Sequence, residues 1–356
     1  MEMTEFTLYK NRTWVKIFSL DISILLCSCL GPGHSKNIKK VLGIGVNTTP
    51  FVIRKGFSFY YYDNAELESF GKELARRVIQ NHALSFQWCK KVKEGTDCLR
   101  SLMKKYYGKL ISKEAFENFI KHLDEYVVVY VAVKQVANYL PKDVLPIFLP
   151  VFDENRNYSE SIFPEMIDFF DSLAKTISEK TGYNSHLILS CVKSEFEHYL
   201  LTGKLPDKAI LEKRFEAAVL DYYKGDYKLY SGEHVGIFEE ALLGSSDVNY
   251  LQGMAAHPGK VIGKVSVVLN PHDAAHFKKG DILIAGMTRP AYLHLMEKAS
   301  AIVTDAGGIL CHAAIVAREM KIPTIVGTEK ATVIFRNGDL VEVDAYNGIV
   351  KKIKKN

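Results

Sequence analysis

The sequence lacks the short patterns that mark a metal centre or a disulfide framework. Its 356 residues include six cysteines, and these form no CxxC pair and have no ligand spacing to a histidine. Scattered cysteines in a chain of this length are typical of reduced thiols in a cytosolic protein. We therefore expect no bound metal, no disulfide framework and a cytoplasmic location.

A long apolar run is also missing. The segment most like one is IFSLDISILLCSCL at residues 17–30. It follows the basic residues Lys10, Arg12 and Lys16 and so has some features of a signal peptide. Asp21 interrupts the run, and what remains is too short to span a bilayer. We interpret it as a buried element and predict no membrane association; export is the less favoured alternative.

The chain shows little excess of charge of one sign. The net charge is +5, and residues 251–356 contain 14 Lys and Arg against nine Asp and Glu, so the excess lies entirely in that part. Arginine and aromatic residues are not interleaved as they are in RNA-binding surfaces, and the terminal lysines are typical of a solvated end. No nucleic-acid partner is predicted.

Residues 1–245 show mainly helical periodicity. Two apolar runs in residues 41–62, VLGIGV and FVIRKGFSFYYY, predict a short strand region, after which Asp63-Asn64 caps a helix and helical spacing continues to about residue 140. Further helices are expected from Pro164 to Gly182 and over residues 185–201 and 207–223. The aromatic stripes are interpreted as core. This part contains no recognisable Gly-rich phosphate loop and no acidic metal cluster.

The character of the chain changes after Gly244-Ser245-Ser246-Asp247, which we interpret as a linker. Residues 251–356 alternate short β-branched runs with turn signals, as in VIGKVSVVL, GDILIAG, AIVTDAGG and PTIVG. This pattern predicts a compact β/α domain. The whole chain is therefore expected to be an α+β multidomain protein, with a mainly α domain over residues 1–245 and a β/α domain over 251–356.

One stretch of this second domain points to phosphate chemistry. In AIVTDAGGILCHAAIVAREMKIPTIVG (residues 301–327) a buried strand leads to Asp305, Gly307 and Gly308, and a helix starts at His312. Glycines allow close backbone approach to a ligand, and a helix N-terminus offers free N–H groups to an anion. Neutral imidazole is a nucleophile near neutral pH. From these residues alone, two interpretations of His312 remain equally favoured: a structural histidine and a phosphoryl carrier.

The same stretch resembles the mobile domain of the PEP-utilising enzymes, a family that includes phosphoenolpyruvate synthases, pyruvate phosphate dikinases and rifampicin phosphotransferase-like proteins. The resemblance extends to residues 253–268, 280–290 and 337–353. It implies a phosphohistidine swivelling domain in which His312 carries the phosphoryl group. It further implies a phosphate loop formed by Thr304, Asp305, Gly307, Gly308 and Cys311, with Thr288 at the rim of the site.

The family's nucleotide-binding ATP-grasp domain and its PEP-binding barrel are not recognised here. The resemblance thus implies a phosphotransferase component that receives its phosphoryl group through a separate ATP-grasp-type subunit, which would use Mg²⁺ and ATP (or PEP), while this chain binds no cofactor itself. Residues 1–245 would bind a small-molecule acceptor or act as a linker domain. The alternative is a non-catalytic regulatory or binding protein that retains the swivelling-domain fold.

Overall fold

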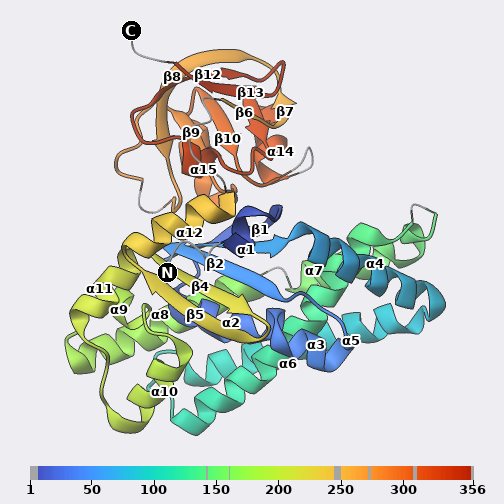
Figure 1. Cartoon of the computed structure of the whole chain (residues 1–356), viewed down its shortest axis with the longest axis vertical. Helices are drawn as coiled ribbons and strands as arrows, with labels where there is room; N and C mark the ends of the chain where they lie inside the picture. Colours follow the sequence, from blue (N-terminus) through green and yellow to red (C-terminus); the bar gives the residue numbers. More distant parts are fainter. Residues whose placement is uncertain are drawn as a thin grey trace. The chain divides into compact units, whose positions relative to one another are not determined.

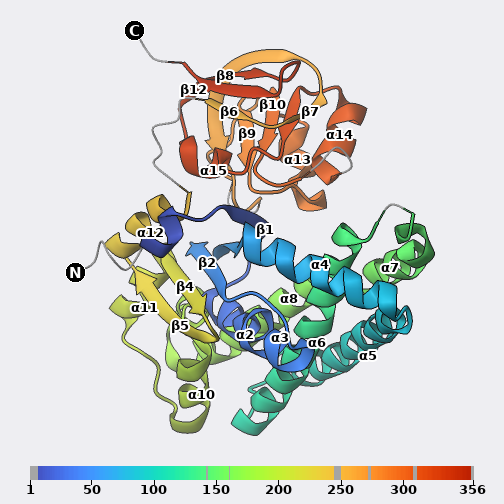
Figure 2. The ribbon, with the colours of Figure 1, turned by 45° about the vertical axis from the view of Figure 1, so that its right-hand side comes forward.

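A computed structural model describes residues 7–141, 143–159, 161–243, 250–271, 274–307 and 311–353. The chain divides into two compact units. One contains Arg12–Trp14 and Asp21–Ile237, and is called the helical unit below. The other contains Met1–Asn11, Val15–Leu20 and Phe238–Asn356, and is called the C-terminal unit. Figures 1 and 2 show the elements of each, and the mixture of helices and strands confirms the α+β class.

The helical unit contains most of the helices of the described chain. They are α2 (Ile24–His34), α3 (Lys36–Leu42), α4 (Asn64–Gln80), α5 (Ala83–Tyr106), α6 (Lys113–Tyr139), α7 (Leu145–Ser159), α8 (Ile162–Thr181), α9 (Ser185–Ile188), α10 (Lys193–Thr202) and α11 (Lys208–Glu216). Four strands of a sheet lie in this unit in the order β3-β2-β4-β5, with β2 (Thr48–Arg54), β3 (Phe57–Asp63), β4 (Ala218–Tyr223) and β5 (Asp226–Ser231). Strand β1 (Trp14–Leu20) lies almost wholly in the C-terminal unit.

Helix α2 packs between this sheet and α6 (Figure 1). Two glycines permit the close approach. A Cβ on Gly31 would lie 2.1 Å from the Tyr222 ring of β4, and a Cβ on Gly33 would lie 2.6 Å from Val127 of α6. Residues 24–31 of α2 are buried, so the prediction of a buried element is confirmed for the second half of the apolar run at residues 17–30. Residues 17–20 belong to β1 and are mostly half-buried.

Several local predictions for the helical unit are confirmed. Asp63 caps α4, because its side chain accepts a hydrogen bond from the Glu66 N–H at 2.9 Å. Helix α8 ends at Gly182, which has a left-handed backbone. Strands β2 and β3 form an antiparallel pair, and all seven residues of β3 are buried, so its aromatic side chains belong to the core.

Three local predictions are wrong. VLGIGV is not a strand, because its first residues complete α3 and Gly43 then ends that helix with φ 70°. The helix expected over residues 185–201 is two helices, α9 and α10. The helix expected over residues 207–223 ends at Glu216, and AVLDYY continues as β4, whose antiparallel pairing with β2 and β5 outweighs local helical spacing.

The C-terminal unit is built on an eight-stranded sheet with the order β6-β13-β12-β8-β9-β10-β11-β7. The strands are β6 (Tyr250–Gln252), β7 (Met254–His257), β8 (Lys260–Val267), β9 (Ile282–Ala285), β10 (Ala301–Thr304), β11 (Thr324–Val326), β12 (Leu340–Asp344) and β13 (Ile349–Lys352). The helical elements are α1 (Thr7–Lys10), most of α12 (Glu233–Leu243), η1 (Pro290–Tyr292), α13 (Leu293–Met296), α14 (His312–Met320) and α15 (Ala331–Ile334). The predicted β-branched runs are therefore confirmed as strands.

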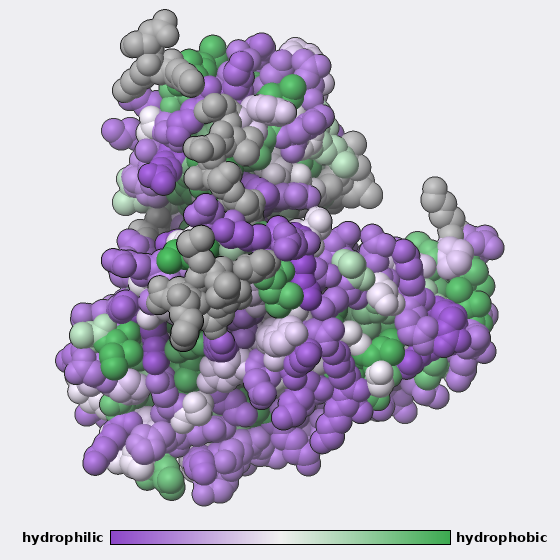
Figure 3. Space-filling view, in the orientation of Figure 1, coloured by the Kyte–Doolittle hydropathy of each residue, from purple (hydrophilic) through white to green (hydrophobic). Residues whose placement is uncertain are grey.

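The core of the C-terminal unit lies on both faces of its central strands. Ile282 and Ile284 of β9 face one apolar cluster, and Leu283 and Ala285 face another, as the alternation of side chains along a strand requires. On the face seen in Figure 3, hydrophobic residues are scattered among hydrophilic ones. Within the described residues, no helix is both long and apolar enough to cross a membrane. The predicted linker at Gly244–Asp247 lies outside the described residues.

Candidate functional site

The candidate site lies where parallel strands end. Strands β8, β9, β10 and β11 are parallel neighbours, so their carboxyl ends meet at one edge of the sheet. Thr288 follows β9, Asp305 and Gly307 follow β10, and Gly327 follows β11. Ligands bind at this edge in open α/β sheets. Segments that are distant in sequence are therefore brought together by strand pairing alone.

His312 is the first residue of α14, the helix that connects β10 to β11. Cys311 is the N-cap residue, with extended backbone, and makes no side-chain capping hydrogen bond. The last residue of the helix is Met320, and the C-cap residue Lys321 adopts a left-handed backbone conformation. Pro323 follows two residues later and cannot continue a helix. The free N–H groups and the positive end of the helix dipole thus lie beside the histidine.

Thr288 fixes the orientation of the His312 ring. Its Oγ1 lies 3.0 Å from His312 Nδ1, and the threonine is buried, with 4% of its surface exposed. His312 is half-buried, and burial lowers the pKa of its imidazole. Because Nδ1 is occupied and the lowered pKa keeps the ring neutral to lower pH, Nε2 is the nitrogen available to a reaction partner.

Gly307 brings the loop after β10 close to the start of α14. Its φ is 119°, which an L side chain rarely adopts, and a Cβ at this position would lie 2.7 Å from Cys311 Sγ. Its carbonyl oxygen packs against Gly327, where a Cβ would approach within 2.9 Å. Both glycines are thus required by close contacts between the two loops. Gly308 lies outside the described residues.

Thr304 and Asp305 contact the neighbouring loops, and neither forms a hydrogen bond with His312 among the described residues. Thr304 Oγ1 donates to the Ala306 carbonyl at 2.8 Å. Asp305 is buried and accepts from the Thr332 N–H at 3.0 Å and from the Thr332 hydroxyl. Lys16, in the segment Val15–Leu20 of the same unit, lies 2.6 Å from the carboxylate. These contacts give Asp305 a positioning role.

The structure thus places Thr288 in direct contact with His312, closer than the rim position that the sequence suggested. Sequence reasoning missed Thr332 and Gly327. Gly327 falls in the PTIVG run and had a local signal, because it follows a predicted strand. Thr332 had none, since its contact with Asp305 links residues 27 positions apart. The N-terminus of α14 is the feature of this site that suits an anion such as a phosphoryl group.

Comparison with known proteins agrees with this geometry. Residues 277–348 match the family "PEP-utilising enzyme, mobile domain". A probable phosphoenolpyruvate synthase of Archaeoglobus fulgidus is 46% identical over 100 residues, which are 28% of this chain and 13% of that protein. The phosphoenolpyruvate synthase of Aeropyrum pernix is 48% identical over 101 residues, 28% of this chain and 12% of that protein.

An uncharacterised phosphotransferase of Bacillus subtilis, YvkC, is 40% identical over 107 residues, which are 30% of this chain and 13% of that protein. The matched segment therefore spans about an eighth of the length of these relatives. The resemblance to the PEP-utilising enzymes is confirmed for the mobile domain.

Proposed function

We propose that the C-terminal unit carries a phosphoryl group on Nε2 of His312 and passes it from a donor to an acceptor. The observation that carries this proposal is the placement of His312 at the N-terminus of α14 with Nδ1 hydrogen-bonded to Thr288 at 3.0 Å. The similarity to phosphoenolpyruvate synthases over this domain supports it.

The chemistry follows from the ring's surroundings. With the proton on Nδ1, that N–H donates to Thr288 Oγ1, and the lone pair of Nε2 attacks the phosphorus of the donor in line with its leaving oxygen. The new N–P bond forms as the P–O bond breaks. The transferred phosphoryl oxygens would accept hydrogen bonds from the first N–H groups of α14, whose dipole favours negative charge.

Burial of His312 supports the same role. A histidine that is protonated on both nitrogens has no lone pair to attack with, and burial lowers the pKa of this imidazole by penalising its charged form. The neutral ring therefore persists further into the acidic range than an exposed histidine would. Thr288 selects which nitrogen keeps the proton.

The donor is proposed to be ATP or PEP with Mg²⁺, held by a separate ATP-grasp-type subunit, and the acceptor a small molecule. Within the described residues, no group of three or more His, Cys, Asp or Glu side chains is arranged to hold a metal ion.

Labelling tests the proposal. The full chain is incubated with an extract of the cells that naturally make it and with radiolabelled ATP or PEP. We expect label that survives base and is lost in acid, in the wild type and in His294→Ala, which removes an exposed histidine of α13. His312→Ala should take up none. Equal labelling of His312→Ala, or no labelling of the wild type with either donor, would contradict the proposal.

A further inference from the structure

The segment Val15–Leu20 brings a charged side chain to the loops of the His312 site from near the other end of the sequence. Lys16 Nζ lies 2.6 Å from Asp305 Oδ2, although the two residues are 289 positions apart, and both belong to the C-terminal unit. Their side chains are 3% and 0% exposed, so the pair is withdrawn from solvent. Lys16 lies outside residues 277–348, the segment that matches the family.

Stability alone is a poor explanation of this buried ion pair. Removing two charges from water can cost more than their attraction returns, and apolar residues of similar volume often replace such a pair without loss of stability. The pair does fix a position, however. With the Lys16 ammonium and two donors of Thr332 around it, the Asp305 carboxylate is held from several directions. The effect of Lys16 should therefore lie in where it holds Asp305.

The backbone at Asp305 is bonded to the segment that carries Thr288. The Asp305 N–H donates to the Ala285 carbonyl at 3.1 Å, and the N–H of the next residue donates to the Gly286 carbonyl at 2.9 Å. Ala285 is the last residue of β9, and Thr288 follows three residues later. Thr288 Oγ1 lies 3.0 Å from His312 Nδ1. A shift of Asp305 would thus be passed to the threonine that orients the imidazole.

Asp305 also links the loop after β10 to the loop after β11. Its carbonyl accepts a hydrogen bond from the Glu329 N–H at 2.9 Å. Lys16 and Asp305 line a groove of about 700 Å³ together with Gly307 and Gly327, the two glycines at which these loops meet. Lys16 therefore lies beside both loops of the site, and losing its contact would release the residue that joins them.

We propose that Lys16 is a positioning residue for phosphoryl transfer by His312. Its ammonium holds the Asp305 carboxylate, the Asp305 backbone holds the segment that leads to Thr288, and Thr288 orients the ring so that Nε2 is free. The site thus extends beyond the family segment to a strand near the start of the sequence. The transfer step rests on the proposed function, whereas the orientation of the ring can be tested without it.

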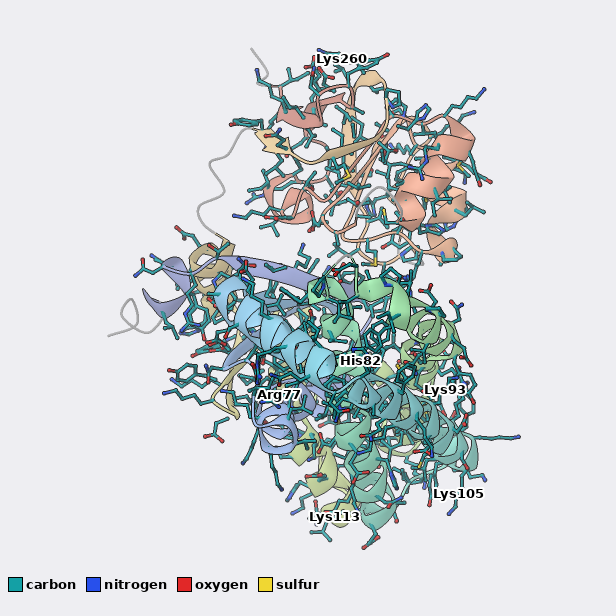
Figure 4. All side chains as sticks on the ribbon, turned by 90° about the vertical axis from the view of Figure 1, so that its right-hand side faces the viewer. Arg77, His82, Lys93, Lys105, Lys113 and Lys260 are labelled. Atoms are coloured by element: carbon teal, nitrogen blue, oxygen red, sulfur yellow. The ribbon has the colours of Figure 1, made fainter. Side chains whose placement is uncertain are left out.

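The first experiment needs no phosphoryl donor. Nitrogen chemical shifts of the His312 imidazole are compared in the full-length wild type, Lys16→Met and Lys260→Met. Lys260 of β8, labelled in Figure 4, is half exposed and lies 3.2 Å from Glu342, so its variant removes a surface ion pair of the same unit. We expect Lys16→Met to lose the preference for a proton on Nδ1 and Lys260→Met to keep it. An unchanged imidazole in Lys16→Met would overturn the proposal.

Transfer is read separately, as the rate at which label appears on His312 in the same proteins. Lys16→Met should label about three- to tenfold more slowly per folded molecule, because it acts through one neutral hydrogen bond, that of Thr288 to the ring. Lys260→Met should label at the wild-type rate. Equal rates for Lys16→Met and the wild type would overturn the positioning role. A wild type that takes up no label would count against the proposed function alone, since the imidazole shifts still test Lys16.

A second variant guards against loss of the fold, because Lys16→Met leaves a buried carboxylate without its cation. The double variant Lys16→Met/Asp305→Asn removes both charges and keeps the size of both side chains close to the original. We expect it to fold and still to show the altered imidazole and the slower labelling, because the ammonium that holds residue 305 is missing. A double variant that orients and labels His312 like the wild type would show that Lys16 only neutralises Asp305, and would overturn the proposal.

Discussion

His312 in the C-terminal unit and Asp124 in the helical unit are both partly buried, yet burial moves their pKa values in opposite directions. It lowers that of His312, because the charged form of an imidazole is the protonated one. It raises that of Asp124 to about 6, because the charged form of a carboxyl group is the deprotonated one. The same desolvation thus keeps the imidazole neutral to lower pH in one unit and the carboxyl group neutral to higher pH in the other.

The His312 site and the surroundings of Asp124 also differ in how they are built. The His312 site is formed by loops at the ends of parallel strands, where glycine backbones and helix N–H groups contribute. Asp124 lies on α6 and lines an open groove together with side chains of α3 and α10, which is called the Asp124 groove. Backbone substitutions should therefore damage the His312 site most, and charge substitutions the Asp124 groove.

The largest effect is expected from Gly307→Val. The branched side chain would have to adopt a φ of 119° and would meet Cys311 Sγ, which would push the loop away from His312. Label on His312 should fall by at least about tenfold, equivalent to roughly 1.4 kcal/mol in the transfer barrier. Gly280→Val is the control, because its φ is 91° but nothing lies within 4 Å of a Cβ there. If both variants label normally, the glycine serves the turn only.

Asp124→Asn should increase stability near pH 7. The folded pKa of about 6 lies above the ordinary 3.8, so the folded state holds the proton more tightly. The protonated Asp124 therefore stabilises the folded state fully below the ordinary pKa of 3.8, and this stabilisation is lost as the pH rises through about 6. At neutral pH the charged carboxylate therefore costs up to about 3 kcal/mol, which the neutral amide avoids.

Urea unfolding would measure the difference in unfolding free energy between Asp124→Asn and the wild type. This difference should shrink as the pH is lowered below 3.8, the ordinary pKa of the group. Asp153→Asn should change stability little at either pH, since that carboxyl is exposed. A destabilised Asp124→Asn protein at neutral pH would mean that the carboxylate has a partner in the folded chain.

Thr288→Val should slow labelling of His312 by about three- to tenfold, because one neutral hydrogen bond contributes roughly 0.5–1.5 kcal/mol. The valine keeps the shape but cannot bond to Nδ1, so the ring loses its preferred tautomer. Nitrogen chemical shifts of the imidazole would report that loss, and Thr288→Ser should restore both properties. An unchanged tautomer in Thr288→Val would reject the positioning role.

The smallest effect concerns His312 and acid stability. Since burial lowers its pKa, the unfolded chain binds the proton more readily, and stability is lost as pH falls below the ordinary value of 6.5. His312→Ala should lose less stability over the same range in urea titrations. The half-exposed ring makes this difference small. A steeper loss in His312→Ala would show that the pKa is raised in the fold.

Much of the C-terminal site could be predicted because its signal is contiguous. His312, Gly307 and Cys311 lie in one short stretch, and the strand before it is buried throughout. The Thr288 contact depends on the parallel pairing of β9 with β10, which the sequence does not display. Thr332 supports Asp305 only after the chain has passed through α14 and β11.

The Asp124 groove had no comparable signal. Asn37, Asp124 and Lys193 are spread across the helical unit, and each has an ordinary local environment in sequence. Strand β4 was missed for a related reason: AVLDYY follows α11 without a helix-breaking residue, and its state is decided by pairing with β2 and β5. Long-range packing, which no local pattern encodes, accounts for both.

The most direct test of the central claim is the position of phosphate on the protein as its own cells make it. The chain is purified under alkaline conditions, which preserve phosphohistidine, and its peptides are examined by mass spectrometry. We predict one phosphoryl group on the peptide that contains His312, lost on brief acid treatment and absent from His312→Ala. Phosphate confined to another residue, or unchanged in His312→Ala, would contradict the account.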